Sequence, residues 1–153
     1  CRKAREIYGR SLRFSKMTGG RYEIVRGESR DKRISAGLEI SVRDNFNNKE
    51  RDISSLSGGE SFQASLALAL GLSDIIQQRN GGIRLDSIFI DEGFGSLDND
   101  SLASAIETLN DLTGNGNRLV GIISHISELK NSIGNKIEVV GTKSGSSIKI
   151  ITD

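Results

Sequence analysis

Two short, uninterrupted apolar segments constrain the fold of this chain more than any other feature. They are Ile88–Ile90 and Leu119–Ile123, and a helical pattern precedes each of them, at about 57–78 and 99–112. Apolar strands without alternation are typical of parallel sheets whose faces are both covered by helices. The sequence therefore predicts the α/β class, with a mostly parallel sheet that is flanked by helices and buried on both faces.

A small antiparallel β unit is expected on the N-terminal side. Residues 2–16 have the apolar spacing of a helix, which paired glycines end. A weak strand at 21–26 and a clearer one at 34–43 alternate apolar and polar residues, as half-buried strands do. The turn-rich segment 44–49 predicts a hairpin that closes into a strand at 51–53.

The helix expected at 57–78 is apolar nearly all round, which predicts an interior position. The helix expected at 99–112 is followed by Gly114 and Gly116, which should stop it. The rest of the chain predicts a short helix and two strands, at 127–132, 136–140 and 147–151.

The charge of the chain is unevenly distributed. The 153 residues carry a net charge of +1, but residues 1–33 sum to +7 and the remaining 120 to −6. A basic end suits a polyanion such as DNA. A solvated helix and strand edge explains the same charges equally well, so charge alone leaves both interpretations open.

Other features limit the class of protein. No stretch reaches the roughly 18 apolar residues that a membrane span needs, and no signal peptide is evident. The single cysteine, Cys1, excludes an intramolecular disulfide framework and a cysteine-based metal site. A cytoplasmic location is expected. Because the chain starts at Cys1 and not at Met, we also expect it to be a piece of a longer protein.

The segment Ser57-Gly58-Gly59-Glu60 opens the first long helix. Ser57 and Glu60 have the spacing of a capping box, which satisfies free backbone N–H groups and needs no further function. The two glycines between them favour a second interpretation. They leave amides uncovered at the positive end of a long helix, where a phosphate can approach closely.

Polar residues follow both apolar strands. Asp91 and Glu92 end the first strand, and His125, the only histidine, lies just past the end of the second. Ligands bind at the carboxyl edge of open α/β sheets, where Asp91 suits Mg²⁺ and Glu92 suits an attacking water. Solvated strand ends are the simpler alternative. A glycine-rich turn then leads to Asp98, which is placed to cap the next helix.

The order of these segments is more specific than any one of them. S-L-S-G-G-E, I-F-I-D-E, G-S-L-D and I-S-H resemble, in this order, the signature, Walker B, D-loop and switch-histidine motifs of the ABC ATPase superfamily. The whole pattern resembles the C-terminal lobe of an ABC-type P-loop ATPase head. Within the superfamily, Leu56–Asp74 and Phe89–Asp98 look most like the SMC-like repair ATPases of the SbcC type, with an SMC-type chromosome-organising head as the alternative.

The resemblance implies a role for each site residue. Asp91 would hold Mg²⁺, Glu92 would position water, and His125 would contact the γ-phosphate of ATP. Ser57, Gly58, Gly59 and Glu60 would reach an ATP held by a second copy, and Asp98 would communicate across that dimer. Residues 1–16 would be the stub of a returning coiled-coil helix, and residues 17–153 the lobe itself.

One motif of the superfamily is absent from the sequence. No G-x-x-x-x-G-K-[ST] occurs, and Gly141–Ser144 is only superficially similar because a strand pattern follows it. The resemblance implies that an N-terminal Walker A lobe of the same polypeptide supplies this motif, so that these residues alone are inactive. It also implies an ATP-dependent homodimer, an SbcD-type nuclease partner, double-stranded DNA, a nucleoid location and no membrane.

Overall fold

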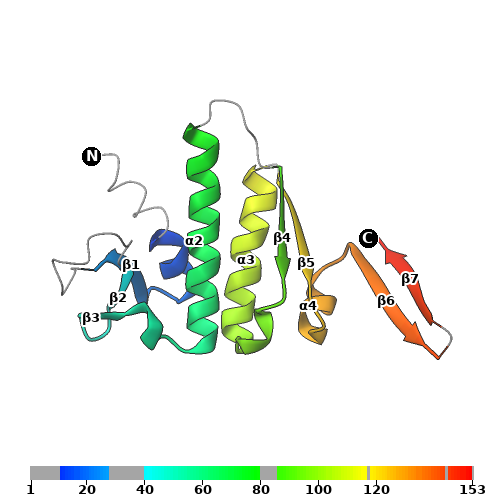
Figure 1. The fold of residues 1–153 in the computed structure, drawn as a ribbon, viewed down its shortest axis with the longest axis horizontal. Coiled ribbons are helices and arrows are strands. Elements are labelled where there is room, and N and C mark those ends of the chain that lie inside the picture. The colour runs from blue at the N-terminus through cyan, green and yellow to red at the C-terminus, as the bar shows by residue number, and fades with distance from the viewer. Residues whose placement is uncertain (1–10, 28–39, 80–85, 117, 144, 153) are drawn as a thin grey trace.

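The computed structural model describes residues 11–27, 40–79, 86–116, 118–143 and 145–152. Residues 11–17 are helical, as predicted, and the predictions for 2–10 and 34–39 lie outside the described residues. The strands between residues 22 and 52, the helices 58–79 and 99–116, and the strands 87–91 and 119–123 follow one another across the molecule (Figure 1). A separate hairpin stands at the C-terminal end.

The predicted antiparallel unit is confirmed. It comprises β1 (Tyr22–Arg26), β2 (Ile40–Asp44) and β3 (Lys49–Asp52), in the order β1-β2-β3. Ile24 lies opposite Val42, and both are buried because the alternating pattern turns one face toward the core. The 3-10 turn η1 (Ile53–Ser55) leads from this sheet into the first long helix.

The central part has the predicted helix–strand–helix–strand order. It comprises α2 (Gly58–Arg79), β4 (Ser87–Asp91), the 3-10 turn η2 (Phe94–Ser96), α3 (Asn99–Gly116) and β5 (Leu119–Ile123). Strands β4 and β5 pair in parallel, with Asp91 opposite Ile123. The helix α3 ends at Gly116, one of the two glycines predicted to stop it. The predicted end near residue 112 is wrong, because Gly114 lies within the helix, at a modest cost in stability.

The prediction that β4 and β5 are buried on both faces is wrong for the residues that the structure describes. Ile88, Ile90 and Val120 pack against the core, but the side chain of Phe89 on the other face is 71% exposed. Leu119 and Ile123 are also exposed. The physical reason is that the helices α2 and α3 cover only one face of the pair (Figure 1).

The interior position predicted for α2 holds for one side of the helix only. Leu66, Ala67 and Leu70 are buried, whereas Leu72 is 52% exposed and Ile76 also meets solvent. Among the described residues, none of the helices combines the length and the apolar character needed to cross a membrane.

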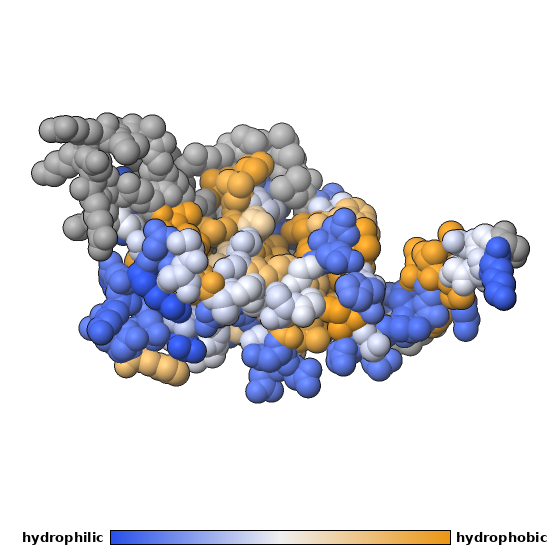
Figure 2. Space-filling view, turned by 60° about the horizontal axis from the view of Figure 1, so that its bottom comes forward, coloured by the Kyte–Doolittle hydropathy of each residue, from blue (hydrophilic) through white to orange (hydrophobic). Residues whose placement is uncertain are grey.

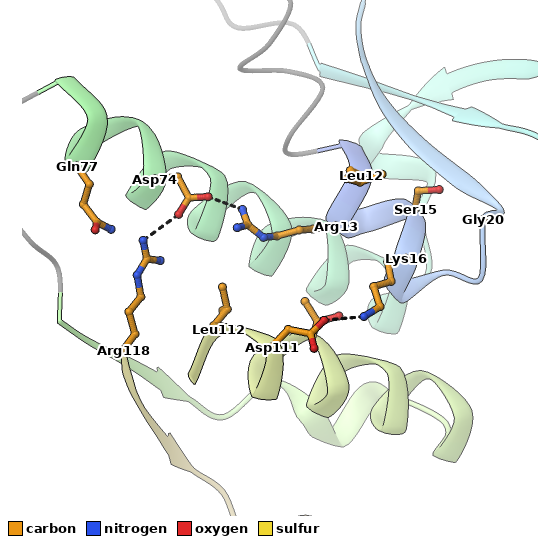
Figure 3. A pocket seen from close by; sticks show the side chains of 11 residues that line it. Leu12, Arg13, Ser15, Lys16, Gly20, Asp74, Gln77, Asp111, Leu112 and Arg118 are labelled. Atoms are coloured by element: carbon orange, nitrogen blue, oxygen red, sulfur yellow. Dashed lines mark hydrogen bonds and ion pairs between the residues drawn. The ribbon is translucent and has the colours of Figure 1, made fainter. Parts of the chain in front are cut away.

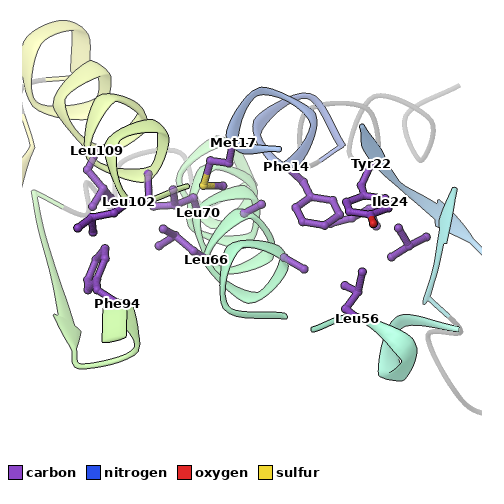
Figure 4. Close-up of a cluster of buried hydrophobic side chains, with 14 of the residues drawn as sticks. Phe14, Met17, Tyr22, Ile24, Leu56, Leu66, Leu70, Phe94, Leu102 and Leu109 are labelled. Carbon is purple, nitrogen blue, oxygen red and sulfur yellow. The ribbon is translucent and has the colours of Figure 1, made fainter. Parts of the chain in front are cut away.

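The core lies between α2, α3, the segment 11–17 and the sheet β1–β3 (Figure 4). Phe14 stacks on Tyr22 with the ring centroids 6.0 Å apart. The buried amide of Gln63 donates a hydrogen bond of 3.0 Å to the Met17 carbonyl oxygen, so α2 is tied to the N-terminal segment by a polar contact as well.

The C-terminal elements are α4 (Ser127–Ser132), β6 (Lys136–Thr142) and β7 (Gly145–Ile151). The two strands form an antiparallel hairpin with a shorter turn than predicted. One face of the hairpin carries two directly opposed apolar pairs, Ile137 with Ile150 and Val139 with Ile148, and all four side chains are exposed. Figure 2 shows apolar surface on this hairpin.

The two faces of α2 allow a matched test of the core. Leu70→Ala is expected to lower the free energy of unfolding by about 2–5 kcal/mol, because a buried side chain leaves a cavity. Leu72→Ala on the same helix should cost about 0.5 kcal/mol, because its side chain already meets solvent. Urea unfolding measures both, and equal losses would contradict this assignment of the faces.

Candidate functional site

The carboxyl ends of β4 and β5 bring together the acid and the histidine that the sequence singles out. Oε1 of Glu92 lies 3.2 Å from Nδ1 of His125, although the residues are 33 positions apart. The backbone holds this geometry, since the Glu92 N–H donates to the Ile123 carbonyl oxygen at 3.0 Å. Both side chains are open to solvent, with exposed fractions of 62% and 79%, so a ligand can reach them.

The backbone at Glu92 has an uncommon conformation. Its φ is +59°, and Gly93 follows with a φ of +96°, so two consecutive residues lie in the left-handed region. A non-glycine residue in this region is costly and is often found at functional sites. The exposed carboxylate of Asp91 lies immediately before this turn, at the last position of β4.

Both hydrogen bonds of the predicted capping box are present. The Ser57 N–H donates to Oε2 of Glu60 at 2.9 Å, and the Glu60 N–H donates to Oγ of Ser57 at 3.3 Å. Within the described part of the chain, the N–H groups of Gly58 and Gly59 have no hydrogen-bond acceptor. They lie in the first turn of a 22-residue helix, where the helix dipole favours an anion.

Two arginines and a tyrosine lie around Glu60, and the sequence did not predict this cluster. Arg21 and Arg51 each lie 3.9 Å from its carboxylate, and both guanidinium groups lie over the Tyr22 ring. Burial acts to raise the pKa of Glu60, but hydrogen bonds from Ser57 and Tyr22 and the charge of Arg51 outweigh it and hold the pKa below its ordinary value.

Close packing explains one of the two glycines without any ligand. A Cβ atom at Gly59 would lie 2.8 Å from the Ser96 carbonyl oxygen, so α2 begins directly against η2. A Cβ atom at Gly58 would lie 3.7 Å from the Ser96 Cβ, an ordinary contact. Gly59 therefore has a structural role, whereas packing does not require glycine at position 58.

Asp98 caps α3, as the sequence predicts. Its Oδ1 accepts a hydrogen bond of 2.8 Å from the Ser101 N–H, and this bond holds the pKa of Asp98 below its ordinary value. A groove of about 400 Å³ joins this cap to the start of α2, and its lining includes Ser57, Gly59, Glu60, Ser96 and Asp98. Four of the predicted residues thus share this groove, and Glu92 and His125 form a second cluster. Gly58 and Asp91 are the chain neighbours of these two clusters.

A larger cavity of about 720 Å³ lies between the segment 11–17, α2 and α3 (Figure 3). Asp74 there accepts ion pairs from Arg13 at 2.7 Å and from Arg118 at 3.0 Å, and Lys16 pairs with Asp111 at 2.7 Å. None of the predicted site residues lines this cavity, and its contacts join the N-terminal segment to both helices.

The donors at the two clusters fit ATP and Mg²⁺ in part. Carboxylate oxygens of Asp91 and Glu92 are ligands that Mg²⁺ accepts, and the free amides of Gly58 and Gly59 suit a phosphate. Across the described residues, however, no three His, Cys, Asp or Glu side chains group closely enough to hold a metal ion. Any Mg²⁺ here therefore needs further ligands beyond these side chains.

Comparisons with known proteins show the family to which the chain belongs. Residues 28–111 match the family model described as SbcC/RAD50-like, Walker B motif. The chain belongs to the SbcC/RAD50-like family. It is 54% identical over 143 residues to the SbcC subunit of the SbcCD nuclease from Vibrio cholerae, and 56% identical over 137 residues to the protein of the same name from Staphylococcus epidermidis. These matches cover 93% and 90% of this chain but 14% and 13% of the relatives, so the chain spans about one seventh of their length.

Solved structures confirm the predicted fold class. The chain resembles the Smc head bound to the C-terminal winged-helix domain of ScpA, with a TM-score of 0.72 and 18% identity over 96% of this chain and 42% of the other. The SMC head domain from Thermotoga maritima gives a TM-score of 0.63 and 21% identity over 97% and 48%. The chain is therefore SbcC/RAD50-like and has the fold of part of an SMC head.

The two glycines of the α2 start predict different responses to alanine. Gly59→Ala is expected to lower the free energy of unfolding by about 1–3 kcal/mol, because the new methyl group meets a backbone oxygen. Gly58→Ala is the matched control and should be neutral or stabilising by up to about 1 kcal/mol. Urea unfolding of the pair decides the matter, and equal tolerance would show that α2 does not begin against η2.

The lowered pKa of Glu60 predicts a pH dependence of stability. Because the carboxyl titrates at about 4.5 when unfolded and lower when folded, its contribution is complete above pH 4.5 and is lost as pH falls through the folded pKa. Glu60→Gln removes this titration. The difference in unfolding free energy between wild type and the variant should therefore shrink below pH 4.5, and a constant difference between about pH 6 and pH 3 would refute the assignment.

Proposed function

We propose that this chain is the C-terminal half of the ATP-binding and hydrolysing head of an SbcC-like protein. The observation that carries the proposal is the Glu92–His125 contact at the carboxyl edge of a parallel strand pair in an SbcC/RAD50-like chain. The relatives that are 54–56% identical are named as parts of the SbcCD nuclease, whereas the SMC heads are 18–21% identical and share the fold alone. The SbcC assignment is therefore favoured over a chromosome-organising head.

In this proposal the Glu92–His125 cluster performs the chemistry. ATP supplies the phosphoryl group that is transferred to water, and Mg²⁺ supplies positive charge at the phosphate oxygens. Glu92 accepts a hydrogen bond from the attacking water and orients it, and His125 donates to the γ-phosphate. Asp91 contributes one carboxylate to the metal ion. The exposure of Glu92 and His125 supports these roles, because each must meet a group from outside this chain.

The groove performs a different task in the proposal. The free amides of Gly58 and Gly59, together with Ser57, bind the phosphates of an ATP that a second copy holds, and Glu60 fixes the Ser57 loop through its two hydrogen bonds. Asp98 lines the same groove and contacts the second copy in the dimer. Two ATP molecules then join two heads into an ATP-dependent homodimer.

An N-terminal Walker A lobe of the same polypeptide is proposed to cover the open apolar faces. The outer face of β4 and β5 carries exposed Phe89, Leu119 and Ile123, and the hairpin β6–β7 adds the four exposed residues of its apolar face. Exposed apolar surface of this extent marks an interface. The relatives have about six-sevenths of their length outside the matched part, which leaves ample chain to supply that lobe.

The partners of the assembled protein follow from the same proposal. The printed name of the relatives supports a nuclease of the SbcD type as the partner of the ATPase. Engagement of the two heads would gate the access of double-stranded DNA to that nuclease, in the cytoplasm at the nucleoid. The basic residues near the N-terminus supply a charge that suits DNA.

The test uses the full-length protein, with its Walker A lobe. Glu92→Gln should lower ATP turnover by about 100-fold or more, because the amide cannot orient the water as the carboxylate does. ATP-dependent dimers should persist and accumulate. Glu128→Gln, at an exposed acid in α4, is the matched control and should leave turnover unchanged. Wild-type turnover in the Glu92 variant would end the proposal.

A further inference from the structure

The two clusters are joined by one aromatic side chain. Phe62 lies on α2, five residues after Ser57, and its half-buried ring packs against the turn that follows Glu92. A Cβ atom added at Gly93 would overlap this ring. The ring also meets Phe94 edge-on, with the centroids 4.8 Å apart and an interplanar angle of 63°.

The turn that Phe62 contacts is conformationally restricted. Gly93 has a φ of +96°, which favours glycine, and Phe94 after it is almost fully buried. The Ser96 hydroxyl donates to the Gly93 carbonyl oxygen at 3.1 Å. Phe62 therefore packs against Gly93 and Phe94, which directly follow Glu92 in the chain.

A second contact makes the start of α2 and this turn one packed unit. Gly59 lies directly against the Ser96 carbonyl oxygen at the far end of η2. Helix α2 thus contacts the segment after Glu92 at both ends, through Phe62 at Gly93 and through Gly59 at Ser96. Because close-packed groups shift together, a displacement of the start of α2 is expected to move the Glu92 turn as well.

We propose that Phe62 is a positioning residue that holds the Glu92 carboxylate in place beside His125 and couples it to the Ser57 loop on the same helix. This inference rests on the proposed function, since it names how one nucleotide site responds to contact with the other. When the groove binds the nucleotide of a second copy, the start of α2 is held in one position. The Phe62 ring, which moves with α2, then holds the turn at Glu92 in the matching position. Phe62 touches no reacting atom; it acts through the turn.

The first experiment separates positioning from folding in the full-length protein. Phe62→Ala should lower kcat by the order of 100-fold, as a misplaced catalytic group does. KM should stay within about twofold, because binding groups are untouched. ATP-dependent dimers should still form. Leu72→Ala removes an apolar side chain from the same helix, away from the turn, and should leave kcat unchanged.

A double-mutant cycle tests the contact itself. Gly93→Ala places a methyl group on the Phe62 ring and should lower kcat strongly. In Phe62→Ala/Gly93→Ala the overlap is gone, so the combined loss should be smaller than the product of the single losses. Multiplicative losses, wild-type kcat in Phe62→Ala, or a loss of dimers equal to the loss of kcat would each overturn the inference. If Glu92→Gln slows turnover while Phe62→Ala does not, only this inference fails; if Glu92→Gln has no effect, the proposed function fails first.

Discussion

The parallel pairing of β4 with β5 is the constraint on which the candidate site depends. With Asp91 opposite Ile123, both strands end at the same edge, and the next residues emerge side by side. The hydrogen bond from the Glu92 N–H to the Ile123 carbonyl oxygen extends this pairing by one residue past β4. A shift of register by one residue would turn the side chains of one strand to the opposite face and separate Glu92 from His125.

The same pairing explains why so much apolar surface is open. Two paired strands leave the backbone groups of their outer edges open, and a parallel sheet is stable when both of its faces are also covered. Here α2 and α3 cover one face, and Phe89 and its neighbours on the other face lie in solvent. The hairpin β6–β7 repeats the pattern with four apolar side chains on one open face. The pair β4–β5 and the separate hairpin β6–β7 thus each present an apolar face that the described residues leave without cover.

The sequence predicts features of this fold that arise from neighbouring residues. The capping box of Ser57 and Glu60, the Asp98 cap and the hairpin β2–β3 all depend on local spacing, and all are present. The closeness of Glu92 and His125 was also predictable, because parallel strands deliver their ends to one edge. Burial of β4 on both faces was predicted wrongly. An apolar strand indicates that both of its faces need to be covered, but its sequence does not indicate which part of a protein covers them.

Contacts between distant segments were not predictable from spacing. Arg21 and Glu60 are 39 residues apart, and Phe62 and Gly93 are 31 apart, so no periodicity links them. Gly93 carries a weak signal at most, because a glycine after a strand fits any turn. Only the packed structure shows that its missing side chain makes room for the Phe62 ring.

The arrangement of the two clusters suggests how two separate nucleotide sites can respond to each other. In the proposed dimer, the groove serves the nucleotide of the second copy and Glu92 serves the nucleotide of its own, so the clusters have no ligand in common. What they share is α2, which starts in the groove and packs along η2 up to the Glu92 turn. Tightly packed side chains have few alternative arrangements, so such a contact favours discrete states over gradual change. Coupling between two nucleotides then requires no long pathway, because a single helix turn and one aromatic ring separate the groups that meet them.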